Sequence, residues 1–485
     1  MRDFLPKLPA VILLIVVGGG SNLYSQYLVS SQSLGMRSIA ELELELNQPV
    51  RTGVSLFKIT YMTSDVHGLT DTASGLLVLP EISLNDALPM VIYQHGTTNG
   101  PMDVPSRLAA GSNEAFAYGA MGYVTIAADY LGLGDHVGFH PYVHAKSQAS
   151  AALDLLFAVT EWIEVMTGEG WIGDLFVSGY SQGGHAAAAI QKELEDNWSL
   201  VYPVTASTPM SGPYSLSGVM YDRIISDEIY YSPAYIAYIT LAYQEAYGNF
   251  YSELSDFFKP AYIPIIENFR NHVTTTTSMN FALVFQIYEE LGFGTCRPKT
   301  MFKDSVLQAI IGNENHPFRV ALRDNDLYDW TPQAPTRLYY CTSDEQVPYQ
   351  NSIVADSVMR INGATDIASV NFGMLSHSGC ATPAIEASIA FFDSFVIPSA
   401  TNPRYRTQDM TIVSPNPASG VLKVASAFME HSTELRITDI SGTTVLRIAE
   451  PLQPSINISL LSSGVYIVHA SQGDKYYQQK VVIFN

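Results

Sequence analysis

The chain has 485 residues, of which 47% are hydrophobic and 15% are charged. This length allows about three domains with a large hydrophobic core, and the composition excludes a long disordered or coiled-coil protein. With 25 basic and 46 acidic residues the formal net charge is −21, which argues against nucleic acids and anionic lipid surfaces as partners. The three cysteines, Cys296, Cys341 and Cys380, are too few for a disulfide-dense scaffold or a four-thiolate zinc site.

The N-terminus has the layout of a secretory signal peptide. Arg2 and Lys7 precede an apolar run over residues 8–17, and small residues follow at 18–21. We expect residues 1–25 to be removed on export, with an uncleaved membrane anchor as the alternative. The apolar run is too short to cross a bilayer comfortably, so we predict no transmembrane segment in the mature chain.

Residues 50–200 alternate strand-like and helix-like segments, which predicts an α/β domain built on a mostly parallel sheet. The sheet would open with a hairpin of two alternating strands and continue with apolar strands buried on both faces. A long amphipathic helix and a short buried strand follow. In chain order these segments are Val54–Met62, Ser74–Leu79, Met90–Tyr93, Val124–Ala128, Gln148–Val165 and Leu175–Val177.

Residues 216–333 interrupt this rhythm with Tyr and Phe at helical spacing, which predicts an inserted helical cap. The cap aromatics suit either an acyl-binding tunnel or the cap's own core. Strands resume at Arg337–Cys341 and Ala368–Met374, and a helix is predicted from about Pro383 to Phe395. The whole α/β domain would span residues 26–397.

A proline-rich stretch then separates a second domain. Four prolines between 398 and 417 indicate a semi-rigid linker over 398–410. Residues 411–485 read as short strands and turns, including a Ser441-Gly442 turn, and predict a small all-β sandwich. Its strands would be Leu422–Ala425, Glu434–Asp439, Thr444–Ile448, Ile456–Leu460, Gly464–His469 and Lys480–Phe484.

Three motifs in this tail resemble the C-terminal sorting domain of type IX secretion cargo. They are Ser414-Pro415-Asn416-Pro417-Ala418, Asp439-Ile440-Ser441-Gly442 and Ser463-Gly464-Val465-Tyr466. The resemblance implies the type IX secretion machinery as a partner and a secreted or cell-surface location. A carbohydrate-binding or spacer sandwich is the alternative.

Gly179-Tyr180-Ser181-Gln182-Gly183 matches G-x-S-x-G, a motif that presents a nucleophilic serine on a sharp turn. The pattern alone is weak, but a strand-like segment precedes it and an Ala-rich helix follows, as the motif requires. The glycines are needed because side chains there would collide with the strand and the helix. Ser181 is therefore the candidate nucleophile, against a buried serine at a strand-to-helix turn.

A serine needs a base to remove its proton and a carboxylate to orient that base. Where this turn occurs, the usual chain order is Ser, acid, His. Of the six histidines after Ser181, only His377 follows a predicted sheet strand; the others are His185, His272, His316, His431 and His469. Asp344 lies in the loop at the carboxyl end of the predicted strand 337–341 and is the candidate acid. Glu345 competes beside it, and Asp324, Asp326 and Asp329 lie upstream.

Acyl transfer also needs hydrogen-bond donors for the negatively charged oxygen of the tetrahedral intermediate. Tyr93-Gln94-His95-Gly96-Thr97-Thr98 follows a buried strand, as the HG motif of esterases does. We predict the backbone N–H groups of Thr97 and Gln182 as donors, with the Thr97 or Thr98 hydroxyl as a third. A plain glycine turn is the alternative.

The chain resembles the α/β-hydrolase superfamily in four features. They are the serine turn at 179–183 (the elbow), the loop at 93–98 (the HG loop), the segment Asp129-Tyr130-Leu131-Gly132-Leu133-Gly134, and the acid and histidine that follow late in the chain. The Tyr-Gln-His-Gly-Thr opening, the Gly-Tyr-Ser-Gln-Gly-Gly elbow and the position of the cap are similar to the secretory lipases. The resemblance covers about residues 50–397. It implies hydrolysis of carboxylic esters through an acyl-enzyme, with Ser181, Asp344 and His377 in the matching positions and without a metal or cofactor.

Two weaker signals accompany these motifs. His136, His140 and His144 recur every four residues beside Asp135 as metal ligands would, but Gly138 and Pro141 break the helix that would align them, which favours a polar loop near the cleft. Cys341 and Cys380 each lie three residues from a candidate triad member. A disulfide between them would pin the triad loops; Cys296 is another available partner, and free buried thiols are common.

The leading hypothesis is an exported serine ester hydrolase, a lipase or esterase. A serine peptidase of the same fold is the enzyme alternative. A non-catalytic surface protein that keeps the hydrolase shell for binding is the alternative from another class.

Overall fold

A computed structural model describes residues 27–82, 88–167, 171, 173–396, 412–415, 418–426, 434–439, 444–449, 454–472 and 475–483. The chain forms two compact units, Met1–Val396 and Ile397–Asn485. The predicted signal peptide (1–25), the predicted linker (398–410) and the predicted Ser441-Gly442 turn lie outside the described residues.

The described part of the larger unit contains a nine-stranded sheet in the order β1-β2-β3-β5-β4-β6-β7-β8-β9. The first three strands are antiparallel to their neighbours, and the six from β5 to β9 are parallel. The predicted opening hairpin and the mostly parallel sheet are therefore confirmed. The strands are β1 Leu28–Arg37, β2 Val54–Ser64, β3 Thr70–Pro80, β4 Met90–Gln94, β5 Val124–Ala128, β6 Leu175–Tyr180, β7 Val204–Met210, β8 Thr336–Tyr340 and β9 Ile367–Asn371.

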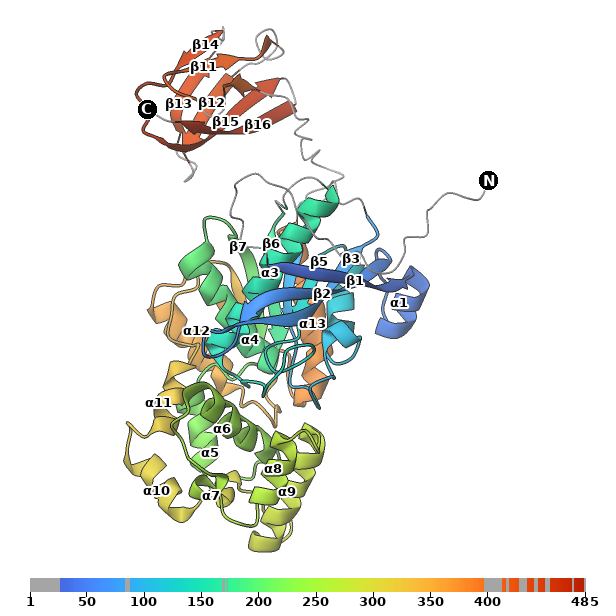
Figure 1. Ribbon diagram of the computed structural model, residues 1–485, viewed down its shortest axis with the longest axis vertical. Helices are drawn as coiled ribbons and strands as arrows, with labels where there is room; N and C mark the ends of the chain where they lie inside the picture. The colour runs from blue at the N-terminus through green and yellow to red at the C-terminus, as the bar shows by residue number, and fades with distance from the viewer. Residues whose placement is uncertain are drawn as a thin grey trace. The chain divides into compact units, whose positions relative to one another are not determined.

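Helices cover both faces of this sheet (Figure 1). Along β4, Met90 and Ile92 pack into one core with α3 (Ala145–Thr167) and α4 (Gln182–Glu193). Val91 and Tyr93 pack into a second core with α1 (Ile39–Leu46), α2 (Ser112–Ala120) and α13 (His377–Asp393). α12 (Gln350–Ile361) contacts β8 and β9. Because both faces are covered, the central parallel strands are continuous apolar runs.

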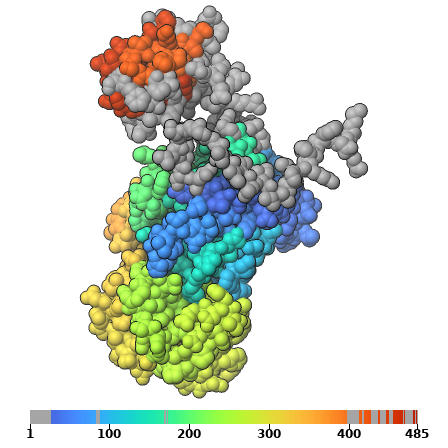
Figure 2. Space-filling model, viewed as in Figure 1, coloured from blue at the N-terminus to red at the C-terminus, as the bar shows by residue number. Residues whose placement is uncertain are grey.

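The residues between β7 and β8 form a helical cap with its own hydrophobic core. Figure 2 shows the cap as a continuous lobe at one end of the larger unit. Phe257, Phe258 and Phe302 are fully buried in the cap, so many of its aromatic side chains serve packing. Its helices are α5 Tyr221–Ile225, α6 Pro233–Tyr247, α7 Leu254–Phe257, α8 Ile263–Arg270, α9 Thr276–Leu291, α10 Asp304–Gly312 and α11 Pro317–Asp324.

The last helix of the larger unit begins earlier than predicted. α13 starts at His377 rather than near Pro383, which lies inside the helix. The start is set by Ser376, whose hydroxyl accepts a hydrogen bond from the Gly379 N–H at 3.2 Å and so satisfies an otherwise unpaired donor of the first turn. The candidate base is thus the first residue of a helix and not part of a loop.

The described part of the smaller unit contains two antiparallel sheets packed over one apolar core, which confirms the predicted all-β tail. The first sheet contains β10 Val413–Ser414, β11 Val421–Val424 and β14 Ser455–Asn457. The second contains β12 Glu434–Asp439, β13 Thr444–Ala449, β15 Gly464–Gln472 and β16 Lys475–Ile483. Leu422, Leu435, Ile437, Val468 and Val481 contribute to the core. Across the described ranges of both units, no helix has the length and apolar character needed to span a membrane.

Candidate active site

Ser181 stands on the tight turn between β6 and α4. Its backbone is held at φ 62° and ψ −122°, a conformation that non-glycine residues rarely adopt. The Ser181 N–H donates to the Met210 carbonyl at 2.9 Å, which ties the turn to β7. At Gly183 a Cβ atom would lie 1.9 Å from the Gln94 carbonyl oxygen, so only glycine fits where the elbow meets the HG loop.

The structure brings Ser181, His377 and Asp344 into one hydrogen-bonded line. His377 Nε2 lies 2.8 Å from Ser181 Oγ, and His377 Nδ1 lies 2.7 Å from Asp344 Oδ2. The side chains of His377 and Asp344 are 7% and 1% exposed, so water competes little for these contacts. The geometry is that of a serine, a base that can take its proton and a carboxylate that orients the base.

The two neighbouring carboxylates occupy different positions. Asp344 Oδ1 accepts from the N–H groups of Gln346 at 2.9 Å and Val347 at 2.8 Å, which leaves Oδ2 for the His377 ring. Glu345 Oε2 accepts from the backbone N–H of His377 at 3.0 Å. Glu345 therefore contacts the first helical residue through its backbone, whereas Asp344 contacts the imidazole.

The other candidate acids and histidines have different partners. Asp324, Asp326 and Asp329 accept hydrogen bonds from Tyr247, Ser217 and Asn362 respectively. His185 is buried against Gln148 and Asn325, and burial lowers its pKa to about 4. His272 and His316 lie in the cap, His469 lies on β15, and His431 lies outside the described residues.

The predicted oxyanion donors lie on the two loops that flank the nucleophile. Gln182 is the first residue of α4, where unpaired N–H groups and the helix dipole favour negative charge. Within the described residues, the N–H groups of Thr97 and Gln182 have no acceptor. The Thr97 hydroxyl lies 2.8 Å from the Tyr142 hydroxyl, and the Thr98 hydroxyl donates to the Gly100 carbonyl at 3.3 Å.

The cap holds the HG loop directly. At the start of α9, the Thr276 N–H donates to the Asn99 carbonyl at 3.0 Å. The Thr276 hydroxyl donates to the Thr98 carbonyl at 2.8 Å. The segment that carries Thr97 is thereby anchored on both the sheet and the cap.

His140 supports the elbow in a way that the sequence did not predict. Its Nδ1 donates to the Leu131 carbonyl at 2.7 Å, and its Nε2 accepts from the Gln182 side-chain amide at 2.8 Å. Burial lowers the pKa of His140 to about 3, so the ring stays neutral, as this hydrogen-bond pattern requires. His140 thus fixes the side chain of a predicted oxyanion residue.

The other two histidines of that loop have separate contacts. His136 Nδ1 accepts from the Gly132 N–H at 3.0 Å, and His144 Nδ1 lies 3.0 Å from the Ser147 hydroxyl. In the part of the chain that the structure describes, no three His, Cys, Asp or Glu side chains gather as metal ligands would. Each of the three histidines of this loop thus has its own hydrogen-bond partner.

Two further contacts fix the helix that begins with the base. The Tyr180 hydroxyl donates to the His377 carbonyl at 2.6 Å. Tyr180 directly precedes Ser181 in the G-x-S-x-G motif, and this position was the one sequence signal for its role. A disulfide joins Cys341, directly after β8, to Cys380 in the first turn of α13. Cys296 is free and buried in the cap. The disulfide links the segments that supply Asp344 and His377.

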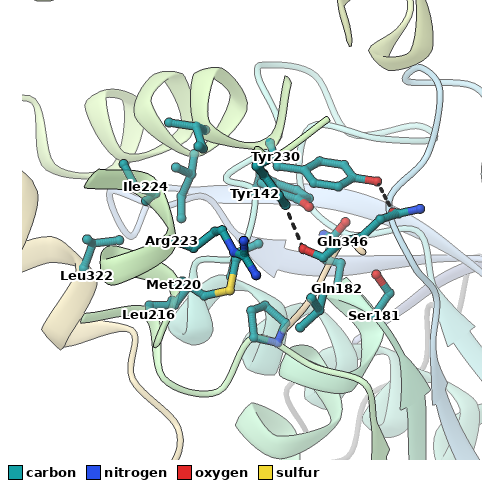
Figure 3. Close-up of a pocket in the computed structure, with 16 residues that line it drawn as sticks. Tyr142, Ser181, Gln182, Leu216, Met220, Arg223, Ile224, Tyr230, Leu322 and Gln346 are labelled. Atoms are coloured by element: carbon teal, nitrogen blue, oxygen red, sulfur yellow. Dashed lines mark hydrogen bonds between the residues drawn. The ribbon is translucent and has the colours of Figure 1, made fainter. Parts of the chain in front are cut away.

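A pocket opens beside Ser181 between the elbow and the cap (Figure 3). Ser181 and Gln182 line one side. Apolar side chains line most of the remainder, among them Leu216, Met220, Ile224, Ile236, Ile239 and Leu322. Two tyrosine hydroxyls end on Gln346: Tyr230 donates to its backbone carbonyl at 2.9 Å and Tyr235 to its side-chain oxygen at 2.7 Å. The site can therefore hold a mainly apolar group next to the nucleophile.

The larger unit is similar to solved hydrolase structures. The rice cell wall degrading esterase LipA from Xanthomonas oryzae is 26% identical with a TM-score of 0.63, over 76% of this chain and 97% of that chain. The larger unit has the α/β-hydrolase fold. A protein described as a hydrolase from Legionella pneumophila is also 26% identical, with a TM-score of 0.69 over 78% of this chain and 100% of that chain. Candida antarctica lipase A in its closed state shares the fold at 13% identity, with a TM-score of 0.57 over 76% of this chain and 81% of that chain.

Residues 413–484 match the family described as the secretion system C-terminal sorting domain. This match confirms the resemblance to type IX secretion cargo, implies the secretion machinery as a partner and marks the protein as secreted or attached to the cell surface. No curated protein matches the chain. Together, the fold and the tail support a secreted hydrolase.

Proposed function

We propose that the larger unit hydrolyses carboxylic esters through an acyl-enzyme formed on Ser181. The observation that carries this proposal is the His377 ring, whose two nitrogens lie 2.8 Å from Ser181 Oγ and 2.7 Å from Asp344 Oδ2. The mainly apolar pocket beside Ser181 supports an ester whose bound group is largely hydrocarbon over a peptide backbone, whose polar groups would need hydrogen-bond partners there. The esterase and lipase names of the structural neighbours agree with this reaction.

In the first half of the reaction, Ser181 Oγ attacks the ester carbonyl carbon while His377 Nε2 takes the hydroxyl proton. Asp344 holds the imidazole in the tautomer whose Nε2 is free to accept and stabilises the imidazolium that forms. The carbonyl oxygen becomes an oxyanion, for which the Thr97 and Gln182 N–H groups are the proposed donors. His377 then gives its proton to the leaving alcohol, and the acyl group stays on Ser181.

In the second half, water replaces the alcohol. His377 Nε2 takes a proton from the water, whose oxygen attacks the acyl carbon. The tetrahedral intermediate collapses, the carboxylic acid leaves, and the proton returns to Ser181 Oγ. The same donors and the same base serve both halves, so the balance is one ester and one water converted into one acid and one alcohol.

The decisive test is Ser181→Ala, assayed with a 4-nitrophenyl ester series from acetate to long acyl chains. Loss of the nucleophile is expected to lower kcat by roughly 10⁴- to 10⁶-fold. Ser33→Ala is the matched control, because Ser33 is exposed on β1, and it should leave kcat unchanged. Retained hydrolysis by the Ser181 variant would overturn the assignment.

Two further measurements separate the alternatives. A fluorophosphonate probe should label the wild type and not Ser181→Ala, because only an activated hydroxyl reacts; an unlabelled wild type would point to a binding protein. Aminopeptide substrates should be cleaved more slowly than esters. Faster amide cleavage would indicate a peptidase instead.

A further inference from the structure

The lining of the pocket beside Ser181 includes a positively charged side chain. Among the residues that line it, all of them described, Arg223 is the only Lys or Arg. Arg223 lies on the short helix α5 of the cap, and its side chain is 26% exposed. Figure 3 shows its guanidinium directed toward the side of the pocket where Gln182 and Gln346 lie.

The guanidinium is only partly paired within the protein. Its Nη1 donates to Glu228 Oε2 at 2.5 Å, and its Cζ lies 5.9 Å from the centre of the Tyr230 ring. Within the described residues, no acceptor pairs with Nε or Nη2. The Glu228 side chain is 71% exposed, and such an ion pair contributes little because water screens it.

The other polar groups of the pocket wall already have partners. The hydroxyls of Tyr230 and Tyr235 donate to Gln346, and the Tyr142 hydroxyl is paired with Thr97. The Gln182 side chain donates to His140. Apart from the backbone N–H groups proposed for the oxyanion, the free donors toward a ligand are therefore those of the Arg223 side chain, whose planar fork is suited to a carboxylate.

We propose that Arg223 is a specificity-determining residue that selects esters carrying a second, anionic carboxylate on the group bound in the pocket. The apolar wall would hold the hydrocarbon spacer, and Arg223 would bind the carboxylate through its unpaired N–H groups. This inference rests on the proposed ester hydrolysis at Ser181. Because Glu228 shares the guanidinium, it competes with such a substrate.

Two substrate series test this selection. Monoethyl esters of linear dicarboxylic acids place the carboxylate on the acyl side, and ethyl esters of monocarboxylic acids of the same length are their neutral partners. O-acetyl ω-hydroxy acids place it on the alcohol side, with alkyl acetates as neutral partners. In one of these series we expect the wild type to prefer the anionic member at a particular spacer length.

Arg223→Met should then lower kcat/KM for the preferred anionic ester by roughly 10- to 100-fold, the usual effect of losing a charge-assisted hydrogen bond. Its kcat/KM for the neutral partner should stay within about threefold of the wild type. Glu228→Gln should raise kcat/KM for the anionic ester, and Arg223→Lys should retain part of the preference. Arg319→Met is the matched control, since Arg319 stacks on Tyr221 at 4.4 Å and does not line the pocket.

The outcomes separate this inference from the reaction on which it rests. If the wild type cleaves neutral esters and prefers them at every length in both series, Arg223 does not select an anion and the inference is wrong. The same holds if Arg223→Met lowers kcat/KM equally for both members of a pair, which is the effect of damage to the pocket. If the wild type cleaves no ester and its Ser181 is not labelled, the proposed function itself is wrong.

Discussion

Two adjacent carboxylates, Asp344 and Glu345, show how finely the site depends on single side chains. Both lie within hydrogen-bond distance of His377, but only Asp344 contacts the imidazole; Glu345 accepts from the backbone N–H. The two residues differ by one methylene and one position. Position along the loop therefore decides which of them orients the base.

This difference predicts unequal effects of two isosteric changes. Asp344→Asn should lower kcat by roughly 10³- to 10⁴-fold, because an amide can stabilise the wrong imidazole tautomer and carries no charge to balance the imidazolium. Glu345→Gln can still accept from the His377 N–H and should lower kcat by less than about tenfold. Steady-state kinetics on one 4-nitrophenyl ester measures both variants. Equal losses would contradict the roles assigned to the two residues.

At the same scale, the sequence could predict that Ser181, Asp344 and His377 come together, because each lies in the connection that leaves the carboxyl end of a parallel strand. A strand end is visible in a local pattern, and parallel strands bring their carboxyl ends to one edge. The supporting contacts are not local. Tyr180 meets the His377 carbonyl across 197 positions and Gln182 meets His140 across 42, and no motif encodes such pairs. Arg223 was missed because its place in the pocket depends on how the cap packs.

At the scale of elements, the segments after β8 and at the start of α13 are held together by the Cys341–Cys380 disulfide. The loop that it closes spans 39 positions, for which chain entropy gives a stabilisation on the order of 4 kcal/mol. The same covalent link keeps Asp344 near His377. Removing the disulfide should therefore lower both the free energy of unfolding and kcat.

Replacing both cysteines, Cys341→Ala with Cys380→Ala, should lower the free energy of unfolding by about 2–4 kcal/mol and also reduce kcat. Cys296→Ala removes a buried thiol far from the triad in sequence and serves as the control; it should cost about 1 kcal/mol of packing with kcat unchanged. Denaturant titration and ester kinetics give the two readouts. An unchanged midpoint and kcat in the double variant would show that the disulfide is dispensable.

The elements that sequence patterns misplaced have identifiable causes. β1 was not predicted because it is an outer strand without a fully buried residue and with an irregular burial pattern, so its residues lack the alternation of a half-buried strand. α13 was placed six residues too late because proline is favoured at helix starts, whereas Pro383 is tolerated here within the helix that Ser376 caps. The buried strands β4 and β5 were predicted closely because their apolar runs are unbroken, whereas β7 was missed because its sequence, VTASTPM, contains no such run.

For the molecule as a whole, buried histidines make folding sensitive to acid. Burial lowers the pKa of His140 to about 3 and the pKa values of His144 and His185 to about 4. An unfolded histidine binds its proton near pH 6.5, so between pH 6.5 and pH 4 the unfolded chain holds more protons than the folded one. Stability is then present above pH 6.5 and is lost as the pH falls. Asp154, whose pKa burial raises to about 6, offsets part of this loss.

We therefore expect the free energy of unfolding to decrease between pH 7 and pH 5. All four tryptophans lie in the larger unit, so intrinsic fluorescence follows that unit alone. His185→Asn should reduce the pH-dependent loss by about 2 kcal/mol, the linkage value for one histidine over this range. Equal losses in the variant and the wild type would contradict the assignment of a neutral His185.

The two compact units predict separable roles at this scale. The smaller unit has its own core, and the pocket and the hydrogen-bonded triad are formed entirely by the larger one. A chain ending at Val396 should keep the kcat and KM of the full protein but should not be delivered to the cell surface or medium. Activity assays on cell fractions measure both properties. Reduced kcat in the purified truncated chain would show that the tail contributes to the site.

The bond between Cys341 and Cys380 also implies that the protein differs covalently before and after export. Thiols stay reduced in the cytosol and pair in oxidising compartments, and this protein is destined for the exterior. While the new polypeptide is still inside, the loop carrying the acid and the helix carrying the base have only non-covalent contacts between them. The Asp344 and His377 segments are therefore joined covalently only after the protein enters an oxidising compartment on its way to the exterior.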